Sequence, residues 1–199
     1  MKPLVSIVIP FHWMKNWQFF LNRCLASIER QNYKNYEVVL IQSGSMPSTS
    51  NRSIESARGD LIKVLYMDDY FGHEFALEEI VNKIGDRKWL VTGCLHDSGD
   101  GNLFNHHVPE YTQDIHTGNN CIGSPSVLTM KAESLMYFDE KLSWLLDCDL
   151  YKRLFKQYGS PAIVPTPNVV IGLHEGQASN LMSSEEKMRE REYLKTKYA

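Results

Sequence analysis

The sequence predicts an α/β fold, in which a mostly parallel central sheet carries helices on both faces. Two observations lead to this prediction. Short, nearly continuous apolar runs recur along the first half of the chain, and segments with helical spacing of apolar residues separate them. Buried parallel strands have that continuous pattern, and right-handed crossovers place the intervening helices on the faces of the sheet. Because 199 residues suit one core, we expect a single domain over residues 1–199.

The first seventy residues predict a strand–helix–strand–helix–strand order. A proline stops the first apolar run, the second run is expected to be a buried strand, and a glycine marks the end of the second helix. The expected elements are a strand at 5–10, a helix at 17–30, a strand at 36–41, a helix at 51–58 and a third strand beginning at 61.

The rest of the chain is less regular. Residues 96–120 are rich in Gly, Asn, Asp and His and predict a long loop, which in a compact domain is usually functional. Two prolines separate the last two runs, which we interpret as edge strands. The expected elements are helices at 74–84, 132–137, 147–158 and 183–197, and strands at 88–94, 127–130, 162–164 and 169–173.

Composition excludes several classes of protein. The net charge is -3, with 43% hydrophobic and 23% charged residues, so no basic excess points to nucleic acid. The early apolar run at 4–10 is too short to span a bilayer and lacks a basic leader, so we expect a cytoplasmic protein without a transmembrane segment. The four cysteines form no C-x-x-C pair and are expected to be reduced, mostly buried thiols.

The stretch 61–71 organises the functional prediction. It starts as an apolar run and ends near two adjacent acids, Asp68 and Asp69. Open α/β sheets bind ligands at the carboxyl ends of their strands. Mg²⁺ usually takes one or two protein carboxylates together with phosphate oxygens. The pair therefore suits a cation that holds a diphosphate, although two solvated turn acids would show the same pattern.

Five segments, in order, resemble the family 2 inverting glycosyltransferases. They are the strand–helix–strand start with Val-Ser-Ile-Val-Ile-Pro, the Asn-Arg-Ser-Ile-Glu-Ser-Ala-Arg-Gly-Asp segment at 51–60, Met67-Asp68-Asp69, the acidic segment 138–154, and the His segment 171–180. Each motif alone is weak, but their common order over about 175 residues is a strong signal.

The resemblance implies the GT-A fold with a small antiparallel C-terminal portion. It divides the chain into a nucleotide-binding half (1–95), an acceptor and catalytic half (96–182) and a terminal helix (183–199). It also implies transfer of a sugar from a nucleoside-diphosphate donor, with a UDP-sugar favoured, to a hydroxyl of a glycan or other acceptor, with Mn²⁺ or Mg²⁺ as cofactor.

The family pattern assigns the acids. Asp69 is expected to contact the metal and Asp68 the ribose. Asp147 falls where the family places the general base that deprotonates the acceptor, although an acid there also suits a helix N-terminus. His174 is expected either to complete the metal shell or to be a structural histidine.

The expected base pocket departs from the family. Phe11-His12-Trp13 stands in place of Thr-Tyr-Asn, and Gln42-Ser43-Gly44-Ser45 in place of Asp-Asp-Gly-Ser. Pro10, Phe11, His12, Gln42 and Ser43 remain candidates for holding or stacking on a base. Since the base-reading carboxylate is missing, UDP is the leading prediction and dTDP and GDP stay open.

The segment Gly118-Asn-Asn-Cys-Ile-Gly-Ser-Pro-Ser resembles the part of the family that lies beneath the donor sugar and acceptor. Asn120, Gly123 and Ser124 are therefore candidates for the sugar pocket, although an irregular connection would have similar residues. Two other functions remain open. A nucleotidyltransferase would share a related sheet but needs a Gly-rich basic loop after the first strand, and a non-catalytic binding module would explain Met67, Gln42 and Leu146.

Overall fold

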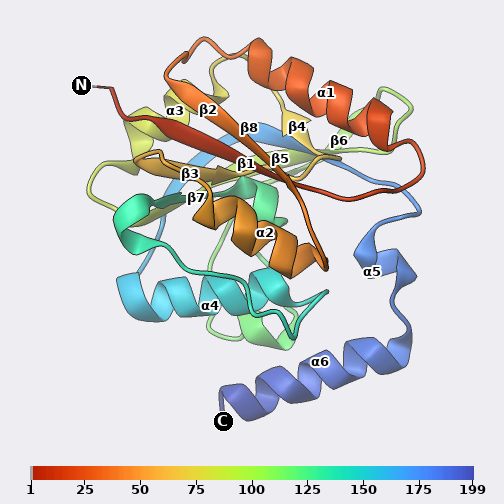
Figure 1. Ribbon diagram of the computed structural model, residues 1–199. Coiled ribbons are helices and arrows are strands. Elements are labelled where there is room, and N and C mark those ends of the chain that lie inside the picture. The colour runs from red at the N-terminus through yellow and green to blue at the C-terminus, as the bar shows by residue number, and fades with distance from the viewer. Residues whose placement is uncertain (1) are drawn as a thin grey trace.

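The computed structural model describes residues 2–199 and contains one eight-stranded sheet with the order β2-β1-β3-β7-β5-β8-β4, in which β6 pairs with β5 outside this path (Figure 1). The strands are β1 (Val5–Phe11), β2 (Tyr36–Gln42), β3 (Leu61–Val64), β4 (Tyr70–Phe71), β5 (Trp89–Asp97), β6 (Leu103–His107), β7 (Leu128–Lys131) and β8 (Ala162–Gly172).

Most strands of this sheet run in one direction. β1 is parallel to β2 and β3, and β5 is parallel to β8. β7 lies antiparallel between β3 and β5, while β4 and β6 are antiparallel to β8 and β5. Strands β1, β2, β3, β5 and β8 therefore share a direction, which confirms the predicted α/β class with a mostly parallel sheet.

Helices cover both faces of the sheet, as the sequence predicts. In Figure 1, α1 (Trp17–Glu29) and α3 (Ala76–Ile84) lie above it, whereas α2 (Met46–Glu55) and α4 (Leu146–Tyr158) lie below it. A short helix, α5 (Ala178–Leu181), leads into α6 (Ser184–Lys197), which lies beyond α4. The core strands β1 and β3 are buried along their whole length, as continuous apolar runs require.

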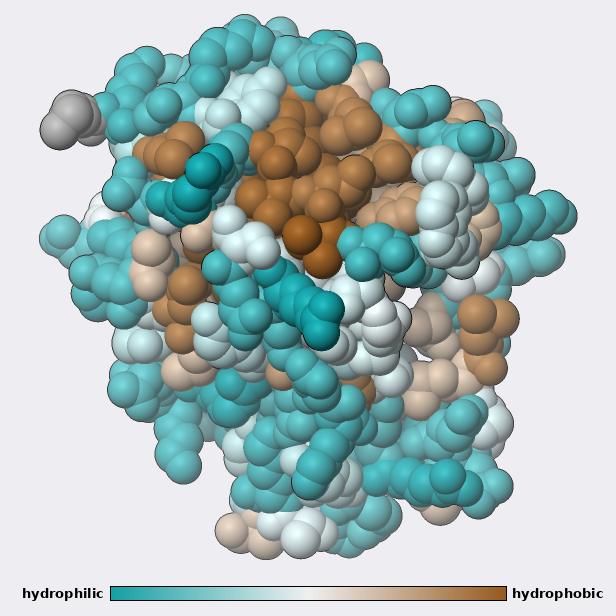
Figure 2. Space-filling view, in the orientation of Figure 1, coloured by the Kyte–Doolittle hydropathy of each residue, from teal (hydrophilic) through white to brown (hydrophobic). Residues whose placement is uncertain are grey.

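The prediction that the second strand is buried is wrong, because β2 is an edge strand. Only one of its sides is hydrogen-bonded, to β1. Val38 is 39% exposed and Leu40 is 44% exposed. Figure 2 shows an apolar area where this strand lies, between α1 and α2.

The predicted helix at 51–58 begins earlier and ends earlier, as α2. The Ser45 side chain caps the helix by accepting a hydrogen bond from the Ser48 backbone N–H, and Pro47 stands in the first turn. Ser at the N-cap followed by Pro is a helix start signal.

The two edge strands predicted at 162–164 and 169–173 are one strand, β8, inside the sheet between β5 and β4. Its prolines lie where the register against β5 shifts, at Thr92, Gly93 and Cys94. A bulge frees the proline from the ladder. Gly93 is required there, because a Cβ would lie 2.9 Å from the Thr166 carbonyl oxygen and closer still to that of Pro165.

Three further predictions change in extent. The stretch 61–71 is two strands, β3 and β4, separated by the turn that carries Asp68. The predicted loop 96–120 contains the end of β5, the exposed strand β6 and one 3-10 turn at Ile115–Thr117. The predicted helix at 132–137 is only a 3-10 turn at Ala132–Ser134.

The predicted terminal helix is confirmed as α6, which starts with a capping box between Ser183 and Glu186. Although mostly charged, it packs on its own chain through buried Glu190 and Leu194. All four cysteines are free thiols, and only Cys121 is not buried. Within residues 2–199, no helix combines the length and the apolar character needed to cross a bilayer.

Candidate active site

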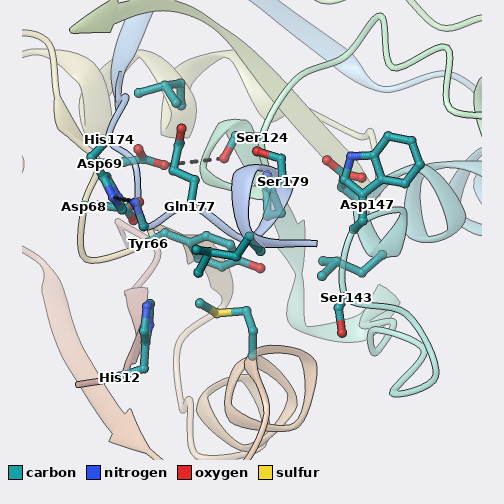
Figure 3. Close-up of a pocket in the computed structure, with 18 of the residues that line it drawn as sticks. His12, Tyr66, Asp68, Asp69, Ser124, Ser143, Asp147, His174, Gln177 and Ser179 are labelled. Atoms are coloured by element: carbon teal, nitrogen blue, oxygen red, sulfur yellow. Dashed lines mark hydrogen bonds and ion pairs between the residues drawn. The ribbon is translucent and has the colours of Figure 1, made fainter. Parts of the chain in front are cut away.

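A cleft of about 810 Å³ opens at the carboxyl ends of β1 and β3 and is lined from both halves of the chain. Figure 3 shows Asp68, Asp69 and His174 on one side of it and Asp147 on the other, with Gln177 and Ser179 between them. The acids expected at the donor and at the acceptor therefore face one shared cleft, although Asp69 and Asp147 are 78 positions apart in the sequence.

The Asp68–Asp69 turn is held by two distant elements. Arg23 of α1 donates to the Asp68 carbonyl oxygen at 2.7 Å and to the Asp97 carboxylate at 2.7 Å. Gly172, at the end of β8, donates its N–H to Asp69 Oδ1 at 2.9 Å. A Cβ on Gly172 would collide with the Asp68 carbonyl oxygen and lie 2.7 Å from Arg23. The turn thus depends on a close backbone approach that only glycine permits.

Asp69 is almost completely buried, with 2% exposure, yet it borders the cleft. Its Oδ2 accepts a 3.4 Å hydrogen bond from Ser124 Oγ. Burial and the neighbouring charge of Asp68 raise the pKa of Asp69 to about 8. A buried carboxyl that resists ionisation in this way is a group that a bound cation would stabilise in its charged form.

His174 lies against Asp68. Its Nε2 is 2.9 Å from Asp68 Oδ2, and its Nδ1 accepts from the Gly176 backbone N–H at 3.1 Å. This second bond requires an unprotonated Nδ1, so Nε2 carries the proton and donates a hydrogen bond to Asp68 Oδ2. His12 also lines the cleft. Burial lowers the pKa of His12, and the negative charge of Asp68 acts in the opposite direction.

Asp147 lies in the first turn of α4, on the opposite wall. Its Oδ2 accepts from Asn120 Nδ2 at 2.8 Å, and its Oδ1 accepts from the Cys148 backbone N–H at 2.7 Å. Burial raises the pKa of Asp147 to about 6, although these hydrogen bonds act in the opposite direction. A carboxyl with this pKa is ionised near neutral pH and is more basic than an ordinary aspartate, as a general base should be.

The segment 120–124 connects the two walls. Asn120 Oδ1 accepts from the backbone N–H groups of Ile122 (3.1 Å) and Gly123 (2.9 Å), so its amide is aimed at Asp147. At the other end of the segment, Ser124 Oγ contacts Asp69. Asn120 and Ser124 line the cleft, whereas Gly123, predicted with them, does not.

The expected nucleotide-binding residues divide into two groups. His12 and Asp68 line the cleft, together with Trp13 and Gly44. Pro10, Phe11, Gln42 and Ser43 do not line it. The Pro10 and Phe11 side chains are buried at the end of β1, where Phe11 packs edge-on against Trp13 at 4.8 Å. Gln42 is exposed at the end of the edge strand.

Sequence reasoning missed a lysine beneath the site. Lys63 in β3 is completely buried, and its Nζ donates to the Ser126 carbonyl oxygen. Burial lowers the pKa of Lys63 to about 7, while Asp69 and Cys94 favour its charged form. The apolar neighbours of Lys63 predict a strand but not the orientation of this side chain. The signal that was available is the charge itself, since a lysine in the centre of a buried run needs a partner.

Trp144 and Gln177 were also missed, and both line the cleft. Trp144 stands three residues before Asp147, inside a segment interpreted only as part of an acidic motif. A large aromatic side chain beside a candidate base was the signal that could have identified it.

The acids fit a divalent cation. Asp68 and Asp69 offer carboxylate oxygens at the cleft, which are ligands that Mg²⁺ and Mn²⁺ accept. Among the described residues, no group of three or more His, Cys, Asp or Glu side chains could hold a metal alone. Any cation would therefore need oxygens from the ligand as well, and a diphosphate supplies them.

No protein-family model matches the sequence, and no curated protein matches it. Solved structures share its fold. Residues 1–349 of S. aureus TarS in complex with UDP-GlcNAc match with a TM-score of 0.69 and 17% identity, over 98% of this chain and 66% of that chain. The same TarS fragment in complex with UDP gives a TM-score of 0.66 and 15% identity, over 100% of this chain and 72% of that chain.

A second protein with a similar fold is the mannosyltransferase PcManGT from Pyrobaculum calidifontis, in complex with GDP-Man and Mn²⁺. It matches with a TM-score of 0.59 and 14% identity, over 90% of this chain and 59% of that chain. These likenesses show that the chain has the nucleotide-diphospho-sugar transferase (GT-A) fold, as its motifs predict.

Proposed function

We propose that the protein is an inverting, metal-dependent glycosyltransferase that transfers a sugar from a nucleoside-diphosphate donor to an acceptor hydroxyl. The observation that carries the proposal is the arrangement of the acids: Asp68 and Asp69 on one wall of a cleft and Asp147 on the other, within a GT-A fold. Fold alone would not support a function, because one fold hosts many activities.

Asp147 is the proposed general base. Its carboxylate accepts the proton of the acceptor hydroxyl while that oxygen attacks the anomeric carbon. The new carbon–oxygen bond forms as the bond from the anomeric carbon to the diphosphate breaks, and the nucleoside diphosphate leaves with the electron pair. Attack on the face opposite the leaving group inverts the anomeric carbon. The position of Asp147, across the cleft from Asp68 and Asp69, suits this in-line geometry.

Asp69 and Asp68 are the proposed cation-binding residues, with Mn²⁺ or Mg²⁺ as candidates. A cation held by these residues would supply positive charge to offset that of the departing diphosphate. In this chain His174 donates to Asp68, which supports a role in orienting that carboxylate. Direct ligation through the unprotonated Nδ1 of His174 would replace the hydrogen bond from the Gly176 N–H.

The donor is proposed to be a UDP-sugar, with its base near His12, Trp13 and Gly44. Trp13 is 64% exposed at the edge of the cleft, so its ring is available to stack on a base. TarS structures hold UDP and UDP-GlcNAc, which favours UDP, while the GDP-Man complex of PcManGT keeps GDP as the competing choice.

Donor turnover with and without metal tests the proposal. UDP-, GDP- and dTDP-sugars would be incubated with wild-type protein in Mn²⁺ and in EDTA, and released nucleotide would be measured. We expect metal-dependent release from one nucleotide class. Asp147→Asn should lower kcat by about 10²–10⁴-fold while nucleotide affinity is retained. Asp86→Asn, at an exposed acid outside the cleft, is the matched control. Unchanged turnover in Asp147→Asn would exclude Asp147 as the base, and binding without any turnover would indicate a non-catalytic module.

A further inference from the structure

The backbone just before Asp147 is held by a carboxylate from the terminal helix. Glu190 of α6 accepts hydrogen bonds from the N–H groups of Ser143 (2.7 Å), Trp144 (3.0 Å) and Leu145 (2.8 Å). Glu190 is 8% exposed, so these are buried, charge-assisted bonds. Ser143 to Asp147 line the cleft without interruption. The wall that carries the proposed base is therefore fixed by a residue about forty positions away in the sequence.

This contact replaces an ordinary helix cap. The N-cap residue of α4, Leu145, has no side-chain cap, and its own N–H is one of the groups that Glu190 satisfies. A negative charge at a helix N-terminus is favourable. A cap from the adjacent residue would stabilise α4 equally well. A cap from α6 additionally determines where the segment 143–145 lies relative to α6.

Further polar contacts hold α6 in this place. Lys197 forms ion pairs of 2.7 Å with Asp139 and with the buried Asp149, and the Tyr198 hydroxyl donates to Asp149 at 2.7 Å. Asp149 lies two residues after the proposed base. The contacts of α6 with its own chain thus occur on both sides of Asp147.

Trp144, which precedes α4, is the cleft-lining residue that contacts side chains of α6. Its indole ring is half-buried and lies beside Asp147. Two side chains of α6 form cation–π contacts with it, with Arg191 Cζ at 5.0 Å and Lys187 Nζ at 5.6 Å from the ring centroid. Arg191 and Lys187 are four residues apart and so belong to one face of the helix. The backbone of Trp144 is held by Glu190 and its ring by these cations, which together restrict the orientation of the indole.

We propose that Trp144 is the stacking platform of the acceptor subsite, that the acceptor is a saccharide whose ring packs on the indole, and that Glu190 is the positioning residue of this subsite. The proposal rests on the proposed function and names the acceptor class for it. The C–H groups of a sugar ring carry partial positive charge and pack on the electron-rich face of an indole. A sugar stacked there has hydroxyls at its edge, next to the carboxylate of Asp147 that would accept a proton.

Measuring the effect of each variant on acceptor KM separately from its effect on nucleotide affinity tests this subsite. Wild type, Trp144→Ala, Trp144→Phe, Glu190→Gln and the exposed control Glu192→Gln would be compared for nucleotide affinity, donor hydrolysis and acceptor KM. The acceptors are methyl glycosides of glucose, galactose, mannose, N-acetylglucosamine and glucuronic acid. Trp144→Ala should raise acceptor KM at least about tenfold and leave nucleotide affinity within about twofold, while Trp144→Phe retains most of the acceptor affinity.

Glu190→Gln should raise acceptor KM and lower kcat together without changing nucleotide affinity, because it displaces both Trp144 and Asp147. Glu192→Gln, whose side chain lies in solvent, should match wild type. A wild-type acceptor KM in Trp144→Ala, or an equal loss of nucleotide and acceptor affinity, would overturn the subsite and leave the proposed function intact.

A binding measurement that needs no turnover separates the two proposals. Saturation-transfer NMR of the same methyl glycosides reports contact with the protein directly. If wild type turns over no donor, the proposed function fails, and sugar signals that disappear in Trp144→Ala still support the subsite. Signals that are absent from wild type, or unchanged in Trp144→Ala, overturn it.

Discussion

Asn120 Nδ2 donates a 2.8 Å hydrogen bond to Asp147 Oδ2, and the orientation of that amide is set by two backbone N–H groups that bind its oxygen. Asn120, a loop residue, therefore supplies the hydrogen bond to one carboxylate oxygen of the proposed base. The other oxygen is held by the Cys148 backbone N–H. The basicity of Asp147 and the orientation of its carboxylate thus depend on two segments of the chain, the loop at Asn120 and the first turn of α4.

The first prediction concerns the pH dependence of turnover. Asp147 must be ionised to accept a proton, and its pKa is raised to about 6 by burial. We expect kcat to fall as pH decreases through about 6. Asn120→Ala removes a hydrogen bond that favours the charged carboxylate, so the acid limb of the kcat profile should move to higher pH and kcat at neutral pH should fall by about tenfold.

Asn119→Ala is the matched control for that profile, because Asn119 is adjacent in sequence but contacts Asp114 instead. Its acid limb should coincide with that of wild type. If Asn120→Ala leaves the limb unmoved, the hydrogen bond to Asp147 has no part in setting its basicity.

The second prediction links cation binding to stability. The pKa of Asp69 is raised from 3.8 to about 8, so the folded state favours the protonated form. Its contribution to stability is present below pH 4 and is lost as pH rises through about 8. Asp69→Asn should therefore have a higher Tm than wild type at pH 8 to 9 without ligands, and should lose the Tm increase that Mn²⁺ with nucleotide produces. Thermal unfolding measures both, and a lower Tm in the ligand-free variant would contradict the assignment.

The third prediction separates orientation from ligation at His174. Its Nε2–H bond to Asp68 suits the proposed role of orienting a carboxylate at the proposed cation site. His174→Ala should then weaken Mn²⁺ binding by about 10–100-fold without abolishing it. Calorimetric titration with nucleotide present provides the measurement. His106→Ala, at an exposed histidine outside the cleft, is the control, and a complete loss of Mn²⁺ binding in His174→Ala would instead indicate direct ligation.

The fourth prediction concerns Arg23 of α1, which binds both the Asp68 carbonyl oxygen and the Asp97 carboxylate. Arg23 and Asp97 form a 2.7 Å ion pair with side-chain exposures of 19% and 7%. Arg23→Met leaves the Asp97 carboxylate unpaired and should destabilise the fold by about 2–4 kcal/mol. The double variant Arg23→Met/Asp97→Asn should recover part of that loss. Urea unfolding, with the exposed Arg30→Met as control, distinguishes this from a general effect of removing charge.

The local pattern was sufficient for the class of fold, and the order of motifs that resemble a family identified the acids. Continuous apolar runs and helical spacing predicted most elements of the first half, because burial on both faces imposes that pattern on a central strand. Asp68, Asp69 and Asp147 were identified from motif order, and all three line one cleft. Position along the sheet was not predictable in the same way: β2 has the apolar run of a buried strand but lies at the edge.

The amino-acid sequence by itself determined the alternation of strands and helices, since that pattern depends on neighbours a few residues apart, and the order of its motifs pointed to the acids through a family resemblance. Only the tertiary structure decided that Glu190 holds the wall beside Asp147, that Asn120 binds Asp147, and that Lys63 is buried within the electrostatic influence of Asp69. These relationships join residues that are distant along the chain. The physical reason is that hydrogen bonding and desolvation depend on which groups come into contact in the folded chain, and the local periodicity of the sequence does not specify those contacts.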